Sequence, residues 1–274
     1  MTVLTEYFEL GNGNPIPKLG FGTWQTPNAV APEAVTTALR LGYRHIDTAH
    51  AYGNEAGVAQ GLKASGLVRD QVFITTKVRA EFKSYDQAVQ SIAESLAALD
   101  TAYVDLLLIH APKPWAEMGG RSDAMYFDQN VAVWQALEEA YQRGDARALG
   151  VSNFQVADLE NITSRCEIAP AANQIEVNIG YPEADLVAYC QQRGILVEAY
   201  SPIATGGLLD HAGIKAVADK YGKSVAQVCL RWVLQKDCLP LPKSVHEAYI
   251  RQNTEVDFEI SADDMATLDG LSAE

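Results

Sequence analysis

The chain has 274 residues, 48% of them hydrophobic and 20% charged, which is typical of a globular protein with a sizeable core. Its 35 acidic and 21 basic residues give a formal net charge of −14, which disfavours nucleic acid and anionic membranes as partners. A small anionic ligand stays possible wherever lysines or arginines gather locally.

The segment 6–17 precedes the first strong strand signal, and its sequence distinguishes between two possible folds. A doubly wound open sheet needs a glycine-rich turn that leads from its first strand into a helix. The glycines of "GNGNP" (11–15) have a suitable spacing, but Pro15 and Pro17 prevent the helix that would face a pyrophosphate. We predict instead a β-hairpin over 6–17 that caps the floor of a barrel.

Short runs typical of β-strands recur along the chain, and helical patterns lie between them. Such alternation implies parallel β-α units, and a count of eight matches a closed barrel of ordinary length. We predict one α/β domain over residues 1–274, a (β/α)8 TIM barrel. The predicted strands are 18–22, 43–47, 72–77, 104–110, 146–152, 171–177, 195–201 and 239–244.

Several intervening segments carry clear helix signals. Apolar residues recur about every four positions after Ser84, and Gln87 completes a possible capping box. Gly144 is a natural C-cap, and Ser224 is a natural N-cap. The helices predicted in this way are 84–99, 128–143 and 224–235.

Polar side chains stand at the ends of three consecutive predicted strands. Asp47 ends the second strand with Tyr52 shortly after it, Lys77 ends the third, and His110 ends the fourth. Each alone is commonly structural, as a turn, cap or surface residue. Barrel closure would bring them together at the carboxyl ends of the strands, where such barrels have their active sites.

Together these four residues form a coherent set for proton transfer. The Lys77 ammonium favours the phenolate and is expected to lower the pKa of Tyr52 from about 10. Asp47 would pair with Lys77 and keep it charged, and a neutral His110 can donate an N–H to a carbonyl oxygen. No strong nucleophile or metal site accompanies them. None of these residues can attack the carbonyl carbon, and a hydride from a reduced nicotinamide would do so.

Cysteines and apolar stretches set further expectations. The four cysteines have no Cys-x-x-Cys spacing, so we expect buried reduced thiols and no metal site. No apolar stretch approaches about 18 residues and no signal peptide is evident, which predicts no membrane association and a cytoplasmic location.

Six motifs follow one another along nearly the whole chain: "LGFGTWQ" (19–25), "GYRHIDTAHAYGNE" (42–55), "LGVSNF" (149–154), "NQIEVN" (173–178), "EAYSPI" (198–203) and "LPKSV" (241–245). By these motifs and their order the chain resembles the aldo-keto reductases, in particular the bacterial branch related to diketogluconate reductases and general aldehyde reductases. This resemblance implies a (β/α)8 barrel, a monomer, and NADPH-dependent reduction of aldehydes and ketones.

The resemblance also implies residue roles. Tyr52 would be the general acid, Lys77 would tune it, Asp47 would support Lys77, and His110 would orient the carbonyl. Trp24, His110 and Trp115 would contact substrate. The implied cofactor residues are Thr23 and Trp24 lining the site; Ser152, Asn153 and Gln174 at the carboxamide; Tyr200 stacking on the nicotinamide; Ser201, Pro202, Ile203 and Thr205 near the pyrophosphate; and Lys243, Ser244, Val245, Arg251 and Asn253 at the adenosine end.

Two positions depart from the family pattern. Tyr249 stands where an arginine usually binds the 2′-phosphate, and Arg251 is two residues further on. Losing one such contact removes roughly 1.5–3 kcal/mol, or about 10- to 150-fold in preference. We expect NADPH with some use of NADH. Ala111 replaces a frequent tryptophan, and Trp115 is the candidate to fill that space.

Two alternative functions remain open from the sequence. Lys77 stands where barrel aldolases can place a Schiff-base lysine, which would make the protein a lyase. A non-catalytic barrel that senses nucleotides and regulates a partner is the second alternative. The physiological carbonyl substrate is not identified by any of these motifs.

Overall fold

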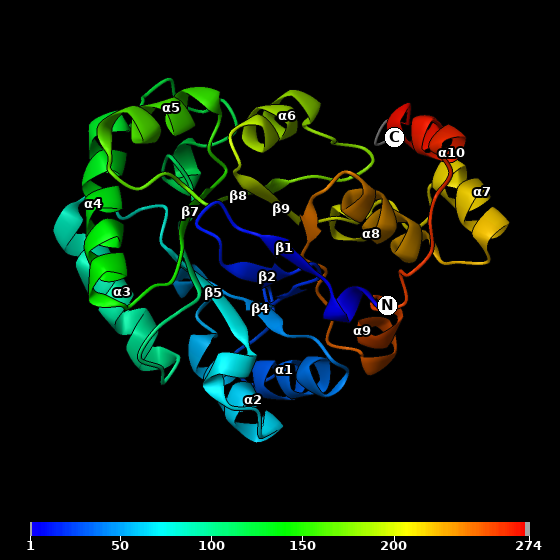
Figure 1. Ribbon diagram of the computed structural model, residues 1–274, viewed down its shortest axis with the longest axis horizontal. Coiled ribbons are helices and arrows are strands. Elements are labelled where there is room, and N and C mark those ends of the chain that lie inside the picture. The colour runs from blue at the N-terminus through cyan, green and yellow to red at the C-terminus, as the bar shows by residue number, and fades with distance from the viewer. Residues whose placement is uncertain (1, 272–274) are drawn as a thin grey trace.

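The computed structural model describes residues 2–271 and contains a parallel eight-stranded sheet in which every strand pairs with its neighbours in the sequence. Figure 1 shows the strands at the centre of the molecule, surrounded by helices. The predicted (β/α)8 class is therefore confirmed. The strands are β3 (Phe21–Gly22), β4 (His45–Asp47), β5 (Phe73–Val78), β6 (Leu106–Ile109), β7 (Leu149–Ser152), β8 (Ala172–Glu176), β9 (Leu196–Tyr200) and β10 (Leu239–Pro240).

Backbone hydrogen bonds join the first and last strands and close the barrel. The N–H of Gly20 donates to the carbonyl oxygen of Pro240 at 3.2 Å, and the N–H of Gly22 donates to that of Pro242 at 3.0 Å. Both prolines serve as acceptors here, a role that needs no N–H. Closure leaves the described eight-stranded sheet without a free edge and brings the carboxyl ends of its strands to one face.

The predicted helices are present, with the caps expected from their sequences. The Ser84 side chain accepts the N–H of Gln87, and Ser224 forms a full capping box with Gln227. Gly144 ends its helix at φ +86°. The α-helices are α1 (Ala31–Arg40), α2 (Glu55–Ser65), α3 (Tyr85–Ala98), α4 (Phe127–Arg143), α5 (Val156–Arg165), α6 (Ala184–Gln192), α7 (Ala212–Tyr221), α8 (Val225–Gln235), α9 (Glu247–Gln252) and α10 (Ala262–Asp269).

Short 3₁₀ turns lie in the loops, and two of them carry residues of the candidate active site. They follow β4 and β6, so they lie on the same side of the barrel. The 3₁₀ turns are η1 (Val3–Thr5), η2 (His50–Tyr52), η3 (Arg69–Gln71), η4 (Trp115–Glu117) and η5 (Ala204–Gly206).

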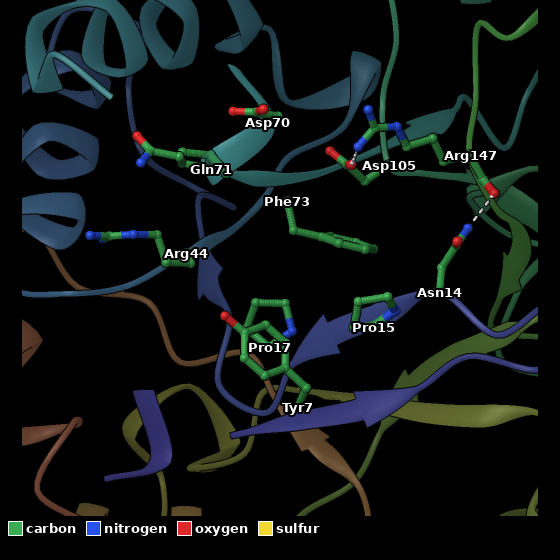
Figure 2. Close-up of a pocket in the computed structure, with 11 residues that line it drawn as sticks. Tyr7, Asn14, Pro15, Pro17, Arg44, Asp70, Gln71, Phe73, Asp105 and Arg147 are labelled. Carbon is green, nitrogen blue, oxygen red and sulfur yellow. Dashed lines mark hydrogen bonds and ion pairs between the residues drawn. The ribbon is translucent and has the colours of Figure 1, made fainter. Parts of the chain in front are cut away.

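An antiparallel hairpin closes the amino-terminal face of the barrel, as the sequence predicted. Its strands are β1 (Tyr7–Glu9) and β2 (Pro15–Pro17), and they lie across the centre of the barrel in Figure 1. Leu10 and Ile16 are buried against apolar residues at the starts of the barrel strands. Figure 2 shows one of these, Phe73, beside the hairpin prolines. Burial of this apolar surface holds the hairpin in place.

Gly150 of β7 lies close to the neighbouring strands, and Gly150→Ala is expected to destabilise the fold. An added Cβ would meet the Ala172 carbonyl oxygen and a Leu108 methyl, both at 2.6 Å. Overpacking of this kind costs about 1–3 kcal/mol, measurable by urea denaturation. Gly270→Ala is the control, since its Cβ would meet nothing nearer than 3.6 Å. Equal midpoints for the two variants would refute the packing argument.

The structure also shows how buried the cysteines are and whether any helix could span a membrane. Cys190, Cys229 and Cys238 are buried and Cys166 is half-buried. Burial raises the pKa of Cys229 to about 12, so this thiol stays protonated and poorly reactive. Among residues 2–271, no helix is both long enough and apolar enough to span a bilayer.

Candidate active site

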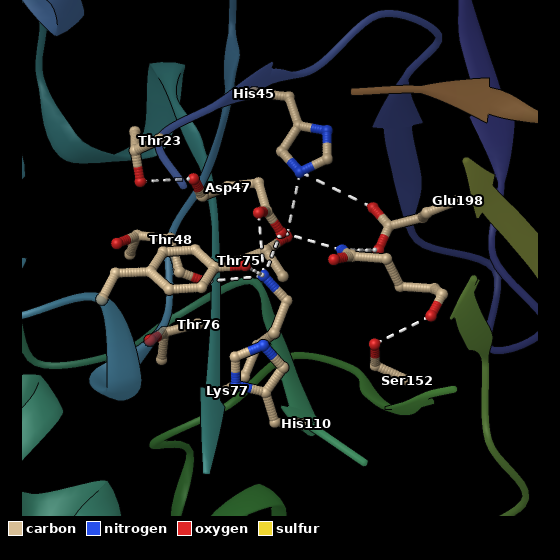
Figure 3. Close-up of polar contacts among 12 residues, drawn as sticks. Thr23, His45, Asp47, Thr48, Thr75, Thr76, Lys77, His110, Ser152 and Glu198 are labelled. Carbon is tan, nitrogen blue, oxygen red and sulfur yellow. Dashed lines mark hydrogen bonds and ion pairs between the residues drawn. The ribbon is translucent and has the colours of Figure 1, made fainter. Parts of the chain in front are cut away.

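The four candidate catalytic residues converge at the carboxyl ends of the strands. Asp47 is the last residue of β4, Lys77 is near the end of β5, and His110 directly follows β6. Tyr52 ends the 3₁₀ turn η2, one short loop beyond Asp47. Figure 3 shows these neighbouring strands directing Asp47, Lys77 and His110 toward one region. The convergence arises from the parallel register, which aligns the strand ends.

Lys77 lies at the centre of the group and is 1% exposed. Its Nζ donates to both carboxylate oxygens of Asp47 at 2.8 Å, to the Thr48 carbonyl at 2.9 Å and to the Tyr52 hydroxyl at 3.3 Å. Burial acts to lower the pKa of Lys77, but the charge of Asp47 and the contact with Tyr52 raise it above its ordinary value. Lys77 is therefore a charged, fully engaged ammonium at neutral pH.

The pKa of Tyr52 differs in net direction from the sequence expectation. Burial raises it, while the charge of Lys77 and its hydrogen bond lower it and the Asp47 carboxylate raises it. Lysine thus acts in the predicted direction, but burial is the larger effect and the net pKa is above its ordinary value. Tyr52 is a protonated phenol at neutral pH, which is the state that a proton donor requires.

His110 is buried and neutral. Burial, followed by the charge of Lys77, holds the pKa of its imidazole well below the usual 6.5. Its ring lies edge-on to Tyr52, with centroids 5.5 Å apart, and edge-on to Trp115 at 5.2 Å. Nδ1 is buried without a hydrogen-bond partner among the described residues. A neutral imidazole carries one N–H, so His110 can donate to a carbonyl oxygen beside the phenol.

A cavity of about 820 Å³ opens above these residues. Asp47, Tyr52, His110 and Trp115 contribute to its wall, and Lys77 lies buried beneath it. Most of the predicted cofactor residues also line the cavity. These are Trp24, Ser152, Asn153, Gln174, Tyr200, Ser201, Pro202, Ile203, Thr205 and Lys243.

Other predicted cofactor residues lie outside this cavity, so their roles stay predictions. Thr23 is buried, and its hydroxyl donates to the Asp47 carbonyl at 2.9 Å. Arg251 pairs with Glu247, one helical turn back, at 3.1 Å. Asn253 is buried at the end of α9. Within residues 2–271, the predicted residues that do not line the cavity are Thr23, Ser244, Val245, Arg251 and Asn253.

Hydrogen bonds hold the polar residues of one cavity wall in fixed orientations. The Tyr200 hydroxyl donates to Asn153 Oδ1 at 2.7 Å, and Asn153 Nδ2 donates to the His110 carbonyl at 3.0 Å. Ser152 Oγ donates to the Gln174 carbonyl at 2.8 Å. Three strand ends, those of β7, β8 and β9, are thereby connected into one rigid wall.

Left-handed backbone conformations concentrate around the same cavity. Gln25, Asn153, Ser201 and Thr205 all line it, with φ values of 56°, 60°, 47° and 55°. Non-glycine residues in this region store about 1 kcal/mol or more each, and such strain clusters at ligand sites. The surrounding contacts therefore shape these loops at a cost in stability.

The two departures noted in the sequence have structural consequences. Tyr249 is 59% exposed and lies outside the described wall of the cavity. Ala111 is fully buried, whereas Trp115 reaches the cavity from the turn η4 and packs against His110. Trp115 therefore occupies part of the pocket wall, as the sequence suggested for it.

Sequence reasoning missed two residues that stand directly below the site. His45 and Glu198 are both fully buried inside the barrel. The available signal was a charged or polar residue in the middle of a buried strand: Glu198 lies between Val197 and Ala199. Such residues are rarely buried without a partner, which marks them for attention.

The closed barrel has a cavity at its carboxyl-end face, beside a phenol and a buried ion pair, which is where enzymes with this fold have their active sites. A family model described as "Aldo/keto reductase family" matches residues 18–273. The chain belongs to this family, as its motifs suggested. Membership implies an oxidoreductase that reduces carbonyl groups with a nicotinamide cofactor.

Relatives are similar over nearly their full lengths. A glyoxal reductase from Bacillus subtilis (strain 168) is 41% identical over 273 residues, covering 99% of this chain and 94% of that protein. A 9,11-endoperoxide prostaglandin H2 reductase from Trypanosoma cruzi is 36% identical over 268 residues, covering 96% of this chain and 90% of that protein.

Solved structures confirm the similarity in three dimensions. An aldo/keto reductase from Brucella melitensis superposes with a TM-score of 0.88 at 37% identity, covering 96% of this chain and 98% of that one. An aldo-keto reductase from Bombyx mori in complex with NADP superposes with a TM-score of 0.86 at 35% identity, covering 96% and 92%. Similar architecture thus extends across the whole barrel.

Proposed function

We propose that the protein reduces aldehydes and ketones to alcohols with NADPH, and that Tyr52 is the general acid. The observation that carries this proposal is the Tyr52 hydroxyl at the cavity wall, 3.3 Å from the buried Lys77 ammonium and beside the neutral His110 ring. A phenol in this position can give its proton to a carbonyl oxygen that His110 holds by an N–H.

Each residue of the site has a separate role in the proposed carbonyl reduction. A reduced nicotinamide held at this cavity would supply a hydride for the carbonyl carbon. Tyr52 gives the carbonyl oxygen a proton, and Lys77 stabilises the phenolate that remains. Asp47 keeps Lys77 charged and fixed through two 2.8 Å contacts. Because the phenolate is the form needed in the opposite direction, alcohol oxidation should favour higher pH.

The cavity fits such a cofactor. Tyr200 presents an aromatic ring for stacking, and Ser152, Asn153 and Gln174 offer polar atoms for a carboxamide. Lys243 is suited to bind the adenosine end of the cofactor. It lines the cavity, and it has no ion pair or hydrogen bond among the described residues. An unpaired cation in a chain of net charge −14 is suited to a phosphate.

Lys243→Ala tests the cofactor preference. Removing a phosphate-binding cation is expected to raise KM for NADPH by about 5- to 50-fold and KM for NADH by about twofold or less. Steady-state kinetics with both cofactors measure this ratio. Lys63→Ala, an exposed lysine on α2, is the control and should change neither KM. Equal effects on both cofactors would remove Lys243 from the 2′-phosphate site.

Small reactive aldehydes are the first substrates to examine, because a similar bacterial protein is a glyoxal reductase. A panel with glyoxal, other aldehydes, ketones and keto acids, assayed by NADPH and NADH oxidation, tests the function directly. Turnover of any carbonyl supports the proposal. No cofactor oxidation across the panel would refute it and favour a nucleotide-sensing barrel.

The charged state of Lys77 argues against the lyase alternative. A Schiff base requires a neutral amine with a free electron pair, whereas Lys77 donates to Asp47, Thr48 and Tyr52. Borohydride trapping should therefore leave Lys77 unmodified in the presence of a carbonyl substrate. Covalent labelling of Lys77 would reverse this conclusion.

A cytoplasmic location and a monomeric state stay predictions.

A further inference from the structure

A second carboxyl group lies buried beneath the site, and the proposed reaction does not use it. Glu198 of β9 is fully buried in the barrel interior. Its Oε2 accepts a hydrogen bond from Gln174 Nε2 at 2.9 Å, and its Oε1 lies 3.7 Å from His45 Nε2. Figure 3 shows Glu198 facing His45 and Asp47 across the barrel. A buried carboxyl group is costly, so its contacts call for an explanation.

The Gln174 amide connects this carboxyl group to the proton-donor site. Its Nε2 donates to Asp47 Oδ2 at 2.8 Å as well as to Glu198, so both amide hydrogens are engaged. The bridge joins residues 127 apart in the sequence and crosses the barrel from β8 to β4. Since the Asp47 carboxylate, paired with Lys77, only accepts hydrogen bonds, the NH₂ end of the amide faces it and the amide oxygen faces away. Gln174 also lines the cavity.

We propose that Glu198 is a positioning residue that acts through Gln174. Its hydrogen bond fixes the Gln174 amide with the NH₂ group on Asp47 and the carbonyl oxygen directed to the cavity, where it can accept from a cofactor carboxamide. Removal of Glu198 frees one N–H and allows the amide to rotate. This inference rests on the proposed function, because it assigns Gln174 to the nicotinamide end of the cofactor.

The charge of Glu198 gives the inference a distinct pH signature. Burial, followed by the nearby Asp47 charge, raises the pKa of Glu198 to about 8, while Gln174 and Lys77 oppose the shift. His45 stays neutral, because burial and then Lys77 lower its pKa to about 3. Below pH 8 Glu198 is a neutral acceptor. Above pH 8 it adds a second anion that raises the pKa of Tyr52.

A double-mutant cycle tests the positioning role. Glu198→Leu should raise the Kd for NADPH, measured by quenching of protein fluorescence, by about 5- to 10-fold, as expected for one lost hydrogen bond. In the Gln174→Leu background the same change should have an effect of about twofold or less, since Glu198 then has nothing to hold. Equal losses in both backgrounds would overturn the inference.

Glu198→Gln provides a variant that preserves shape. It should match the wild type near pH 6, because its side-chain oxygen still accepts from Gln174. In the wild type, Glu198 is ionised above pH 8 and raises the pKa of Tyr52. Because this anion is absent in Glu198→Gln, the rise in the rate of alcohol oxidation with pH should occur up to about one pH unit lower in the variant. Glu138→Gln, a buried glutamate on α4, is the matched control. Coincident profiles for Glu198→Gln and wild type would contradict the charge effect.

A measurement on the cofactor-free protein separates this inference from the proposed function. The ¹⁵N-resolved side-chain amide signal of Gln174, assigned by its loss in Gln174→Leu, should move in Glu198→Leu and titrate near pH 8 in the wild type. A wild type that neither binds NADPH nor reduces carbonyls refutes the proposed function alone. Normal activity with an unresponsive Gln174 signal refutes the positioning role alone.

Discussion

Tyr52→Phe is expected to lower kcat for aldehyde reduction by about 10²- to 10⁴-fold, the contribution usual for a positioned acid. The substitution removes the proton but retains the ring that packs edge-on against His110. Lys77 loses only its 3.3 Å contact and keeps Asp47 and Thr48. Binding of NADPH, measured by fluorescence quenching, should therefore remain close to wild type.

The contrast between turnover and binding makes this test specific. Tyr43→Phe is a control, because Tyr43 is buried elsewhere in the barrel and its hydroxyl donates only a long 3.3 Å hydrogen bond to the Ile250 carbonyl. It should cost little activity. If Tyr52→Phe retains kcat within about tenfold of wild type, another group supplies the proton.

Lys77→Met should reduce both activity and stability. It removes the cation that favours the Tyr52 phenolate and leaves the Asp47 carboxylate buried without its partner. Breaking one side of a buried ion pair typically costs about 3–5 kcal/mol, which urea denaturation can measure. A loss of at least about 10²-fold in kcat is expected, because the acid loses its electrostatic support.

Removing both partners should recover part of the stability. The double variant Asp47→Asn/Lys77→Met no longer buries an isolated charge, so it should be more stable than Lys77→Met alone. Lys236→Met is the surface control, because its pair with Asp269 is partly exposed and is worth about 1 kcal/mol or less. A double variant no more stable than Lys77→Met would show that the buried charge is not the source of the loss.

Much of the fold was predictable from local patterns. The alternation of β-type runs and helical segments identified the eight strands of the barrel, although the observed strands are shorter, as with Leu239–Pro240 within the predicted 239–244. Ser84, Gly144 and Ser224 marked helix ends correctly, because capping depends on residues only a few positions apart. The hairpin followed from two prolines for the same local reason.

The site was partly predictable. Asp47, Lys77 and His110 could be identified as strand-end residues, and parallel register brings such ends together. The net pKa of Tyr52 was not predictable, because the sequence identifies its charged neighbour but not the extent of its burial. The partner of Gln174 across the barrel was likewise hidden, because no local pattern relates residues 127 apart.

By itself the sequence determined the family, the order of strands and helices, and the residue types at the strand ends, since these depend on motifs and short-range periodicity. The tertiary structure alone decided which predicted cofactor residues line the cavity, how burial and charge balance at Tyr52, and that Glu198 meets Asp47 through one amide. These properties depend on barrel closure, which removes water from side chains and joins strands that lie far apart in the chain.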